Sequence, residues 1–153
     1  MSTASLEELL SAAPGGAAME RIVAWMVAAL AEAPAATLAV HLPRALAVLA
    51  GWEDRHREGW LEGFDAPTPH PLAPLLRRVS FDDGDPDYVL PFFASPNITH
   101  LTELDFFLSG EGDESKRRVL DGLCGSPHLG RLTSLSLVGA GLTDDDLARL
   151  LAA

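Results

Sequence analysis

The side chains best suited to metal chemistry are the four aspartates of residues 82–87, Asp-Asp-Gly-Asp-Pro-Asp. A calcium loop of the EF-hand type needs oxygen ligands at alternating positions and a distal glutamate, and this run has neither. The run instead matches a helix start. Asp85 suits the N-cap, Pro86 the first helical position, and Asp87 a place where negative charge interacts favourably with the helix dipole. The sequence therefore predicts a helix start here and no metal site.

The remaining residues with catalytic potential are a single cysteine, Cys124, and five histidines. Cys124 has no partner for a disulfide within the chain, and its apolar surroundings predict a small buried side chain. A nucleophilic cysteine needs a base beside it, and the nearest histidine, His128, follows Pro127 in an expected turn. The histidines lack metal-ligand spacing, and the sequence holds no P-loop, Rossmann or Gly-x-Ser-x-Gly pattern. We therefore expect no cofactor.

One charged stretch at residues 52–60, Trp-Glu-Asp-Arg-His-Arg-Glu-Gly-Trp, keeps an enzyme among the hypotheses. We expect it to be helical, with its two tryptophans on loosely the same side. An enzyme site here would use Glu53, Asp54 or His56. Ordinary charge on a helix surface explains the same residues more simply.

Length and charge restrict the class of protein. A chain of 153 residues is one domain by its size and long enough for a sizeable core. The net charge of −11 disfavours nucleic acid, because an acidic chain repels the phosphate backbone. The first residues lack the basic character of a signal peptide, and the apolar run at 22–31 is too short to span a bilayer. We expect a cytoplasmic protein that binds no membrane.

Three helices are predicted before residue 50. Ser5 and Glu8 match a capping box, in which each side chain satisfies a backbone amide of the first turn. Residues 17–33 have apolar residues at helical spacing, and Pro34 ends that helix. A third helix is predicted over residues 37–49, and Pro43 within it leaves open a start nearer Leu42. The apolar stripes of the second and third helices are Ile22, Val23, Met26, Val27 and Leu30, and Leu38, Leu42, Leu46 and Leu49.

A repeated pattern follows a proline-rich loop. Residues 126–137, Ser-Pro-His-Leu-Gly-Arg-Leu-Thr-Ser-Leu-Ser-Leu, match residues 95–106, Ser-Pro-Asn-Ile-Thr-His-Leu-Thr-Glu-Leu-Asp-Phe. A weaker third copy, Leu-Arg-Arg-Val-Ser-Phe, stands at 76–81. The alternation in L-x-x-L-x-[LF] predicts a strand in each copy, and a fixed order of elements in phased copies is typical of repeat proteins. An apolar segment precedes each Ser-Pro pair, with Tyr88, Val89 and Phe92 in one and Val119, Leu120 and Leu123 in the other.

This pattern resembles the leucine-rich repeat family, in particular its ribonuclease-inhibitor-like subclass in a bacterial form with Ser-Pro-x-Leu turns. The resemblance covers about half of the chain. It implies an α/β fold in which an N-terminal helical cap precedes a short solenoid, with parallel strands on the concave face and helices on the convex face. The expected divisions are a helical region at 1–63, a connecting loop at 64–74, and about three repeats at 75–153, the last of them incomplete.

The sequence departs from the family pattern after each strand. The usual asparagine is missing, because Gly139 or Ala140 stands near its place in the last copy and Ser109 or Gly110 in the middle one. The ladder of asparagines that the resemblance implies is therefore absent. The turns must satisfy their backbone groups in another way.

The resemblance also implies that the outward residues of the strands line a concave binding surface. These candidate partner-binding residues are Arg78, Ser80, Asp82, Glu103, Asp105, Phe107, Ser134, Ser136 and Val138. Phe107 beside Asp105 has the character of an anchor for a partner. A simpler alternative is that Arg78 and Glu103 only pair across strands and that Phe107 packs under the loop of residues 111–116.

We therefore expect a non-enzymatic protein–protein interaction module that uses the strand face. One alternative is a modular piece of a larger leucine-rich-repeat protein, completed by another chain. The small enzyme described above is a second alternative. At the end of the repeats, Thr143 is an expected N-cap, with Asp144, Asp145 and Asp146 at the positive end of the helix dipole. An open strand edge at 132–138 would favour docking or self-association.

Overall fold

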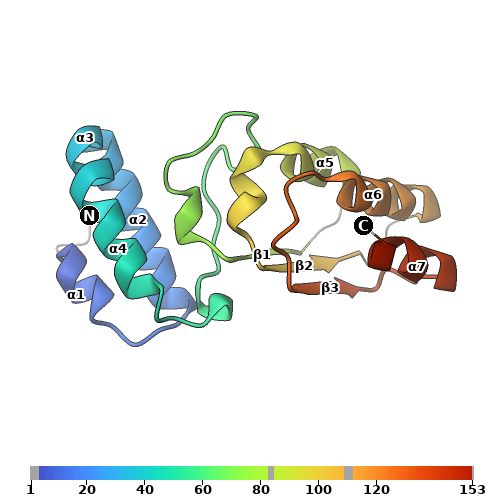
Figure 1. The fold of residues 1–153 in the computed structure, drawn as a ribbon, viewed down its shortest axis with the longest axis horizontal. Helices are drawn as coiled ribbons and strands as arrows, with labels where there is room; N and C mark the ends of the chain where they lie inside the picture. The colour runs from blue at the N-terminus through green and yellow to red at the C-terminus, as the bar shows by residue number, and fades with distance from the viewer. Residues whose placement is uncertain (1–3, 83–84, 109–111, 153) are drawn as a thin grey trace.

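The fold is α/β, with a small open parallel sheet of order β1-β2-β3 (Figure 1). The structure is a computed structural model, and it describes residues 4–82, 85–108 and 112–152. The strands are β1 (Arg78–Phe81), β2 (Glu103–Phe107) and β3 (Ser134–Val138). Each strand falls on one copy of the L-x-x-L-x-[LF] pattern, and the parallel register pairs equivalent residues of successive copies.

Between residues 6 and 49 the chain forms helices that stand beside the sheet (Figure 1). Their bounds are α1 (Leu6–Leu10), α2 (Gly16–Glu32), α3 (Pro34–Ala36) and α4 (Leu42–Leu49), with a π-helical turn at Thr37–His41. The predicted capping box is confirmed, because the Ser5 hydroxyl accepts from the Glu8 amide and the Glu8 carboxylate accepts from the Ser5 amide. Met19, Ile22 and Met26 form the buried face of α2.

Two residues of the predicted apolar stripes are exposed, and that part of the prediction is wrong. Val27 lies beyond the edge of the stripe centred on Ile22 and Met26. Leu38 is turned outward and Thr37 is buried in its place. A π-helical turn carries more residues than an α-helical turn, so it changes the phase of the side chains.

The charged stretch at 52–60 is not the predicted helix. It contains one 3₁₀ turn at Asp54–His56 and then runs alongside β1. The Arg57 carbonyl accepts the backbone N–H groups of Arg77 at 2.9 Å and Arg78 at 3.3 Å. Pairing with the edge of the sheet therefore overrides the local preference for helix.

Helices α5 (Pro86–Ala94), α6 (Asp113–Gly125) and α7 (Asp144–Ala152) gather on one side of the strands (Figure 1). The predicted starts of α5 and α7 are confirmed, since Asp85 accepts from the Asp87 amide and Thr143 accepts from the Asp146 amide. The prediction of a loop at 111–116 is wrong from Asp113 onward, because α6 begins at that residue. Asp83, Gly84, Ser109, Gly110 and Glu111 lie outside the described residues.

Apolar residues from the strands and from α5 form the core beneath the sheet. Phe81 and Phe106 stack with ring centroids 4.7 Å apart, and Phe93 meets Phe106 edge-on at 5.4 Å. Tyr88, in contrast, is exposed on α5. Within the described ranges, the structure holds no helix that is both long enough and apolar enough to cross a membrane.

Serine and threonine hydroxyls bond to backbone carbonyls before the strands, at the opposite end from the missing asparagines. The Thr133 hydroxyl donates to the Thr102 carbonyl at 3.1 Å. The Thr102 hydroxyl lies 3.3 Å from the equivalent Arg77 carbonyl, while its single proton forms the shorter bond to the Asp54 carboxylate at 2.7 Å. We call this series the threonine ladder. Backbone N–H groups of the same two threonines donate to the same carbonyls at 2.8 Å.

The serines of the Ser-Pro pairs make a second series, which we call the serine ladder. The Ser95 hydroxyl donates to the Phe64 carbonyl at 2.7 Å, and the Ser126 hydroxyl donates to the Phe93 carbonyl at 2.6 Å. In both ladders a side chain of one unit bonds to the backbone before it. The repeated residues of the sequence are thus the residues that join successive units.

Candidate functional site

The structure brings eight of the nine candidate residues to one face of the sheet. Along β2, buried Leu104 and Phe106 alternate with Glu103, Asp105 and Phe107, which are at least partly exposed. The parallel register then aligns the candidates in rows across the strands. The rows are Arg78, Glu103 and Ser134; Ser80, Asp105 and Ser136; and Phe107 and Val138, with Asp82 following the end of β1.

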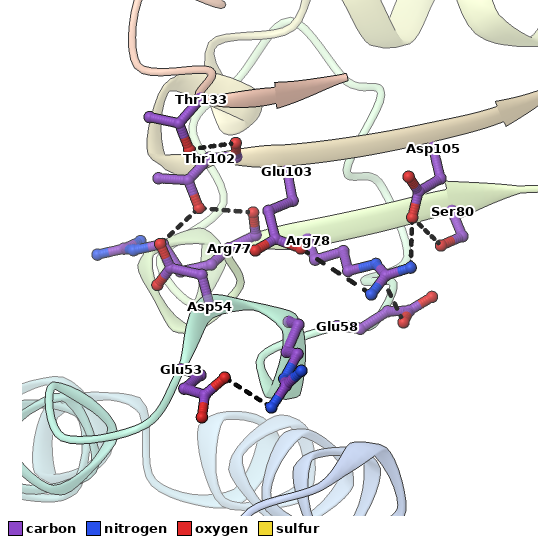
Figure 2. A network of polar contacts seen from close by, with 11 residues as sticks. Glu53, Asp54, Glu58, Arg77, Arg78, Ser80, Thr102, Glu103, Asp105 and Thr133 are labelled. Carbon is purple, nitrogen blue, oxygen red and sulfur yellow. Dashed lines mark hydrogen bonds and ion pairs between the residues drawn. The ribbon is translucent and has the colours of Figure 1, made fainter. Parts of the chain in front are cut away.

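Arg78 is the centre of a charged network on this face (Figure 2). Its guanidinium donates to Asp105 at 2.5 Å and lies 3.9 Å from Glu103, both on β2. Glu58 reaches the same guanidinium from the segment beside β1, at 3.5 Å from Nε. The Ser80 hydroxyl donates to the Asp105 carboxylate at 3.4 Å. One cation therefore holds three carboxylates that come from two separate segments.

The network is acidic overall, since three carboxylates surround a single guanidinium. Burial lowers the pKa of Arg78, but the hydrogen bond and charge of Asp105, followed by the charges of Glu58 and Glu103, outweigh it and raise the pKa. Arg78 thus stays charged at any physiological pH. A surplus of negative charge remains for a cationic group of a ligand.

An apolar pair lies at the other end of the same face. Phe107 of β2 and Val138 of β3 are register partners, with exposed fractions of 46% and 51%. Both side chains are thus open to a partner. Exposed aromatic side chains on a rigid strand are typical anchors for protein partners.

Sequence reasoning missed Glu58, because it lies well before the repeats and only the bridge to Arg78 brings it to the sheet. It also missed Asn97. This buried side chain accepts the His70 amide at 2.5 Å and donates to the Thr68 carbonyl at 3.1 Å, and so holds the proline-rich loop. The one available signal was that an asparagine directly follows a Ser-Pro pair, where turn residues bond to nearby backbone.

Two residues of the enzyme hypothesis, Glu53 and Asp54, make polar pairs with neighbouring side chains. Glu53 pairs with Arg55 at 2.8 Å, and Asp54 accepts the Thr102 hydroxyl at 2.7 Å (Figure 2). A pocket of about 390 Å³ does lie between α2 and β1. Its lining includes Glu20, Glu58 and Ser80, and none of the three residues of the hypothesis.

In the part of the chain that the structure describes, no group of three or more histidine, cysteine or acidic side chains has the arrangement of a metal site. No protein-family model matches the chain, and neither a curated protein nor a solved structure matches it. The chemistry of the sheet face is therefore the main guide to function.

Proposed function

We propose that this chain is a short leucine-rich-repeat array behind a helical cap, and that it acts as a non-enzymatic protein-interaction module through its exposed sheet face. Support for the repeat assignment comes from three parallel strands on phased copies of one pattern, with helices on one side. The threonine ladder supports it further, since its carbonyls at Arg77 and Thr102 are equivalent positions of successive units. In the serine ladder the two donors are equivalent, because each is the serine of a Ser-Pro pair.

The observation that carries the binding role is the combination of charge and apolar surface on one rigid face. The carboxylates around Arg78 lie at one end of the strands, and Phe107 with Val138 lies at the other. A partner segment with a lysine or arginine near one large apolar residue complements both ends. Short serines at Ser134 and Ser136 leave room for its backbone between them.

The alternative of a modular piece completed by another chain concerns a different surface, the edge of β3. It is compatible with binding on the sheet face, because a strand added beside β3 leaves the face exposed. The two surfaces are separable by mutation.

Selection from a library of random displayed peptides tests the proposal. The wild type should enrich sequences that join a basic residue to an aromatic or aliphatic one. Because charge complementarity and the anchor both contribute, Asp105→Asn should weaken binding of the selected peptides, and Phe107→Ala should reduce it at least tenfold (about 1.4 kcal/mol).

Two variants off the face serve as matched controls. Asp121→Asn removes an exposed carboxylate that pairs with Arg149, and Tyr88→Ala removes an exposed aromatic ring of α5. Both should bind the selected peptides as the wild type does. Selection of sequences without basic residues, or equal losses in the control variants, would contradict the proposal.

A further inference from the structure

An uncharged groove lies at the open end of the sheet, beyond β3. Its volume is about 750 Å³, and its walls come from α6, β3 and α7. Leucines dominate the lining, and none of the lining residues carries a charge in a chain of net charge −11. Leu147 and Leu151 on α7 are exposed by 50% and 81%. Exposed leucines around a concave surface are costly in water unless something covers them.

Both hydroxyl ladders end at this groove. The threonine ladder runs through the carbonyls of Arg77 and Thr102, and its next equivalent acceptor is the carbonyl of Thr133. The serine ladder uses the carbonyl of Phe93, two residues before Ser95, and the equivalent residue before Ser126 is Cys124. Among the described residues, neither the Thr133 nor the Cys124 carbonyl accepts a hydrogen bond from another group. Thr133 and Cys124 both line the groove.

The outer edge of β3 likewise has backbone N–H groups without a partner among the described residues. The Ser134 N–H donates to the Thr102 carbonyl, toward β2. In a parallel ladder alternate residues bond to opposite neighbours, so the N–H groups of Leu135 and Leu137 face the open edge. The second unit contacts the third through its apolar side chains, its carbonyl acceptors and its strand edge. The third unit presents the same three features at the groove.

We propose that the groove binds one further unit of the same kind, a polypeptide segment with the pattern Ser-Pro-x-Leu-x-x-Leu-Thr-x-Leu-x-Leu, lying parallel to β3. The leucines of this segment fill the groove, its serine donates to the Cys124 carbonyl, and its threonine donates to the Thr133 carbonyl. A second copy of the chain cannot supply its own first strand for this purpose. The outer edge of β1 is already paired with residues 57–59.

A peptide of residues 126–138 added to the full chain tests the proposal, with hydrogen exchange as the measurement. This segment packs beside β2 within the chain, so it carries every feature that the groove should recognise. At a concentration ten times its Kd, the amides of Leu135 and Leu137 should exchange about tenfold more slowly. A peptide with serine in place of Leu132, Leu135 and Leu137 should have no effect.

Variants of α7 locate the binding to the groove. Leu147→Asp combined with Leu151→Asp should abolish the protection, because it introduces unpaired charge into an apolar contact. Ala148→Asp adds the same charge to an exposed residue of α7 that does not line the groove, and it should bind normally. Where circular dichroism shows that the double variant has lost helix, Leu151→Asp alone replaces it.

Three results would overturn the proposal. They are no protection at peptide concentrations up to about 1 mM, equal protection by the serine peptide, and a symmetric dimer that pairs β3 with β3 and excludes the peptide. The strand-face variant Asp105→Asn should bind the peptide unchanged. Failure of this inference and failure of the proposed function are therefore distinguishable.

Discussion

The two edges of the sheet differ in whether another segment covers them, although β1 and β3 have the same sequence pattern. Beside β1, the Arg57 carbonyl and the Gly59 N–H continue the hydrogen bonding, and the side chains beneath the strand are buried. Beside β3, no described segment continues it, and Leu135 and Leu137 are only half-buried although they occupy the positions of Leu104 and Phe106. The comparison teaches that burial in a repeat comes from the next unit as much as from the residue itself.

Truncating Leu104 of β2 and its register partner Leu135 of β3 should give the largest difference in the free energy of unfolding. Leu104→Ala leaves a cavity between two strands and should lower the free energy of unfolding by about 2–5 kcal/mol. Leu135→Ala, at the register partner, should cost about half as much, because water already reaches that side. Urea denaturation of both variants measures the two values. Equal losses would show that the β3 edge is covered in solution.

The arginine that closes the β1 edge provides the second test. Arg57 is buried, and its guanidinium donates to the carbonyls of Leu75 at 3.0 Å and Pro74 at 2.9 Å. Arg57→Ala leaves the Leu75 carbonyl without a donor and the Pro74 carbonyl with Arg77 alone, at 3.2 Å, and it should cost about 2–3 kcal/mol in urea denaturation. Arg55→Ala is the matched control, since Arg55 makes only an exposed pair with Glu53, and it should change stability by less than about 0.5 kcal/mol.

Low pH should lower the free energy of unfolding through His70, on the β1 side of the sheet, by a smaller amount than the Arg57 variant does. Burial lowers the pKa of His70, whose Nδ1 accepts the Leu72 amide at 3.2 Å in the loop held by Asn97. The unfolded state therefore binds a proton more readily, and stability should fall as the pH drops below about 6.5 until the folded histidine also titrates. His70→Gln should flatten this part of the curve of Tm against pH. An unchanged curve would assign the acid effect to other groups.

The strands and the starts of the helices are the features that the sequence predicts well. Alternation between Leu104 and Phe106 and the caps at Ser5 and Asp85 depend on residues within a few positions of one another. Local patterns of this kind predict secondary structure well, because the residues that make the pattern are the same ones that form the cap or the buried face.

The features that the sequence misses depend on distant contacts. The segment at 52–60 has the composition of a helix, and only the edge of β1 makes it extended. Glu58 joins the charged network for the same reason. The alternation of side chains along each strand is enough to predict the candidate residues of the sheet face. The arrangement of three carboxylates around one arginine depends on how the strands pair.

The hydroxyl ladders have a consequence for how such a gene can change. Each serine and threonine bonds to the segment that precedes it, so duplication or deletion of the stretch encoding one unit, 31 residues between Ser95 and Ser126, leaves every remaining rung with an equivalent partner. Under the proposed repeat assignment, the number of units can thus change one at a time while the helices before them stay unchanged. The sheet face would gain or lose one strand at each event, and each row of side chains would change by one residue.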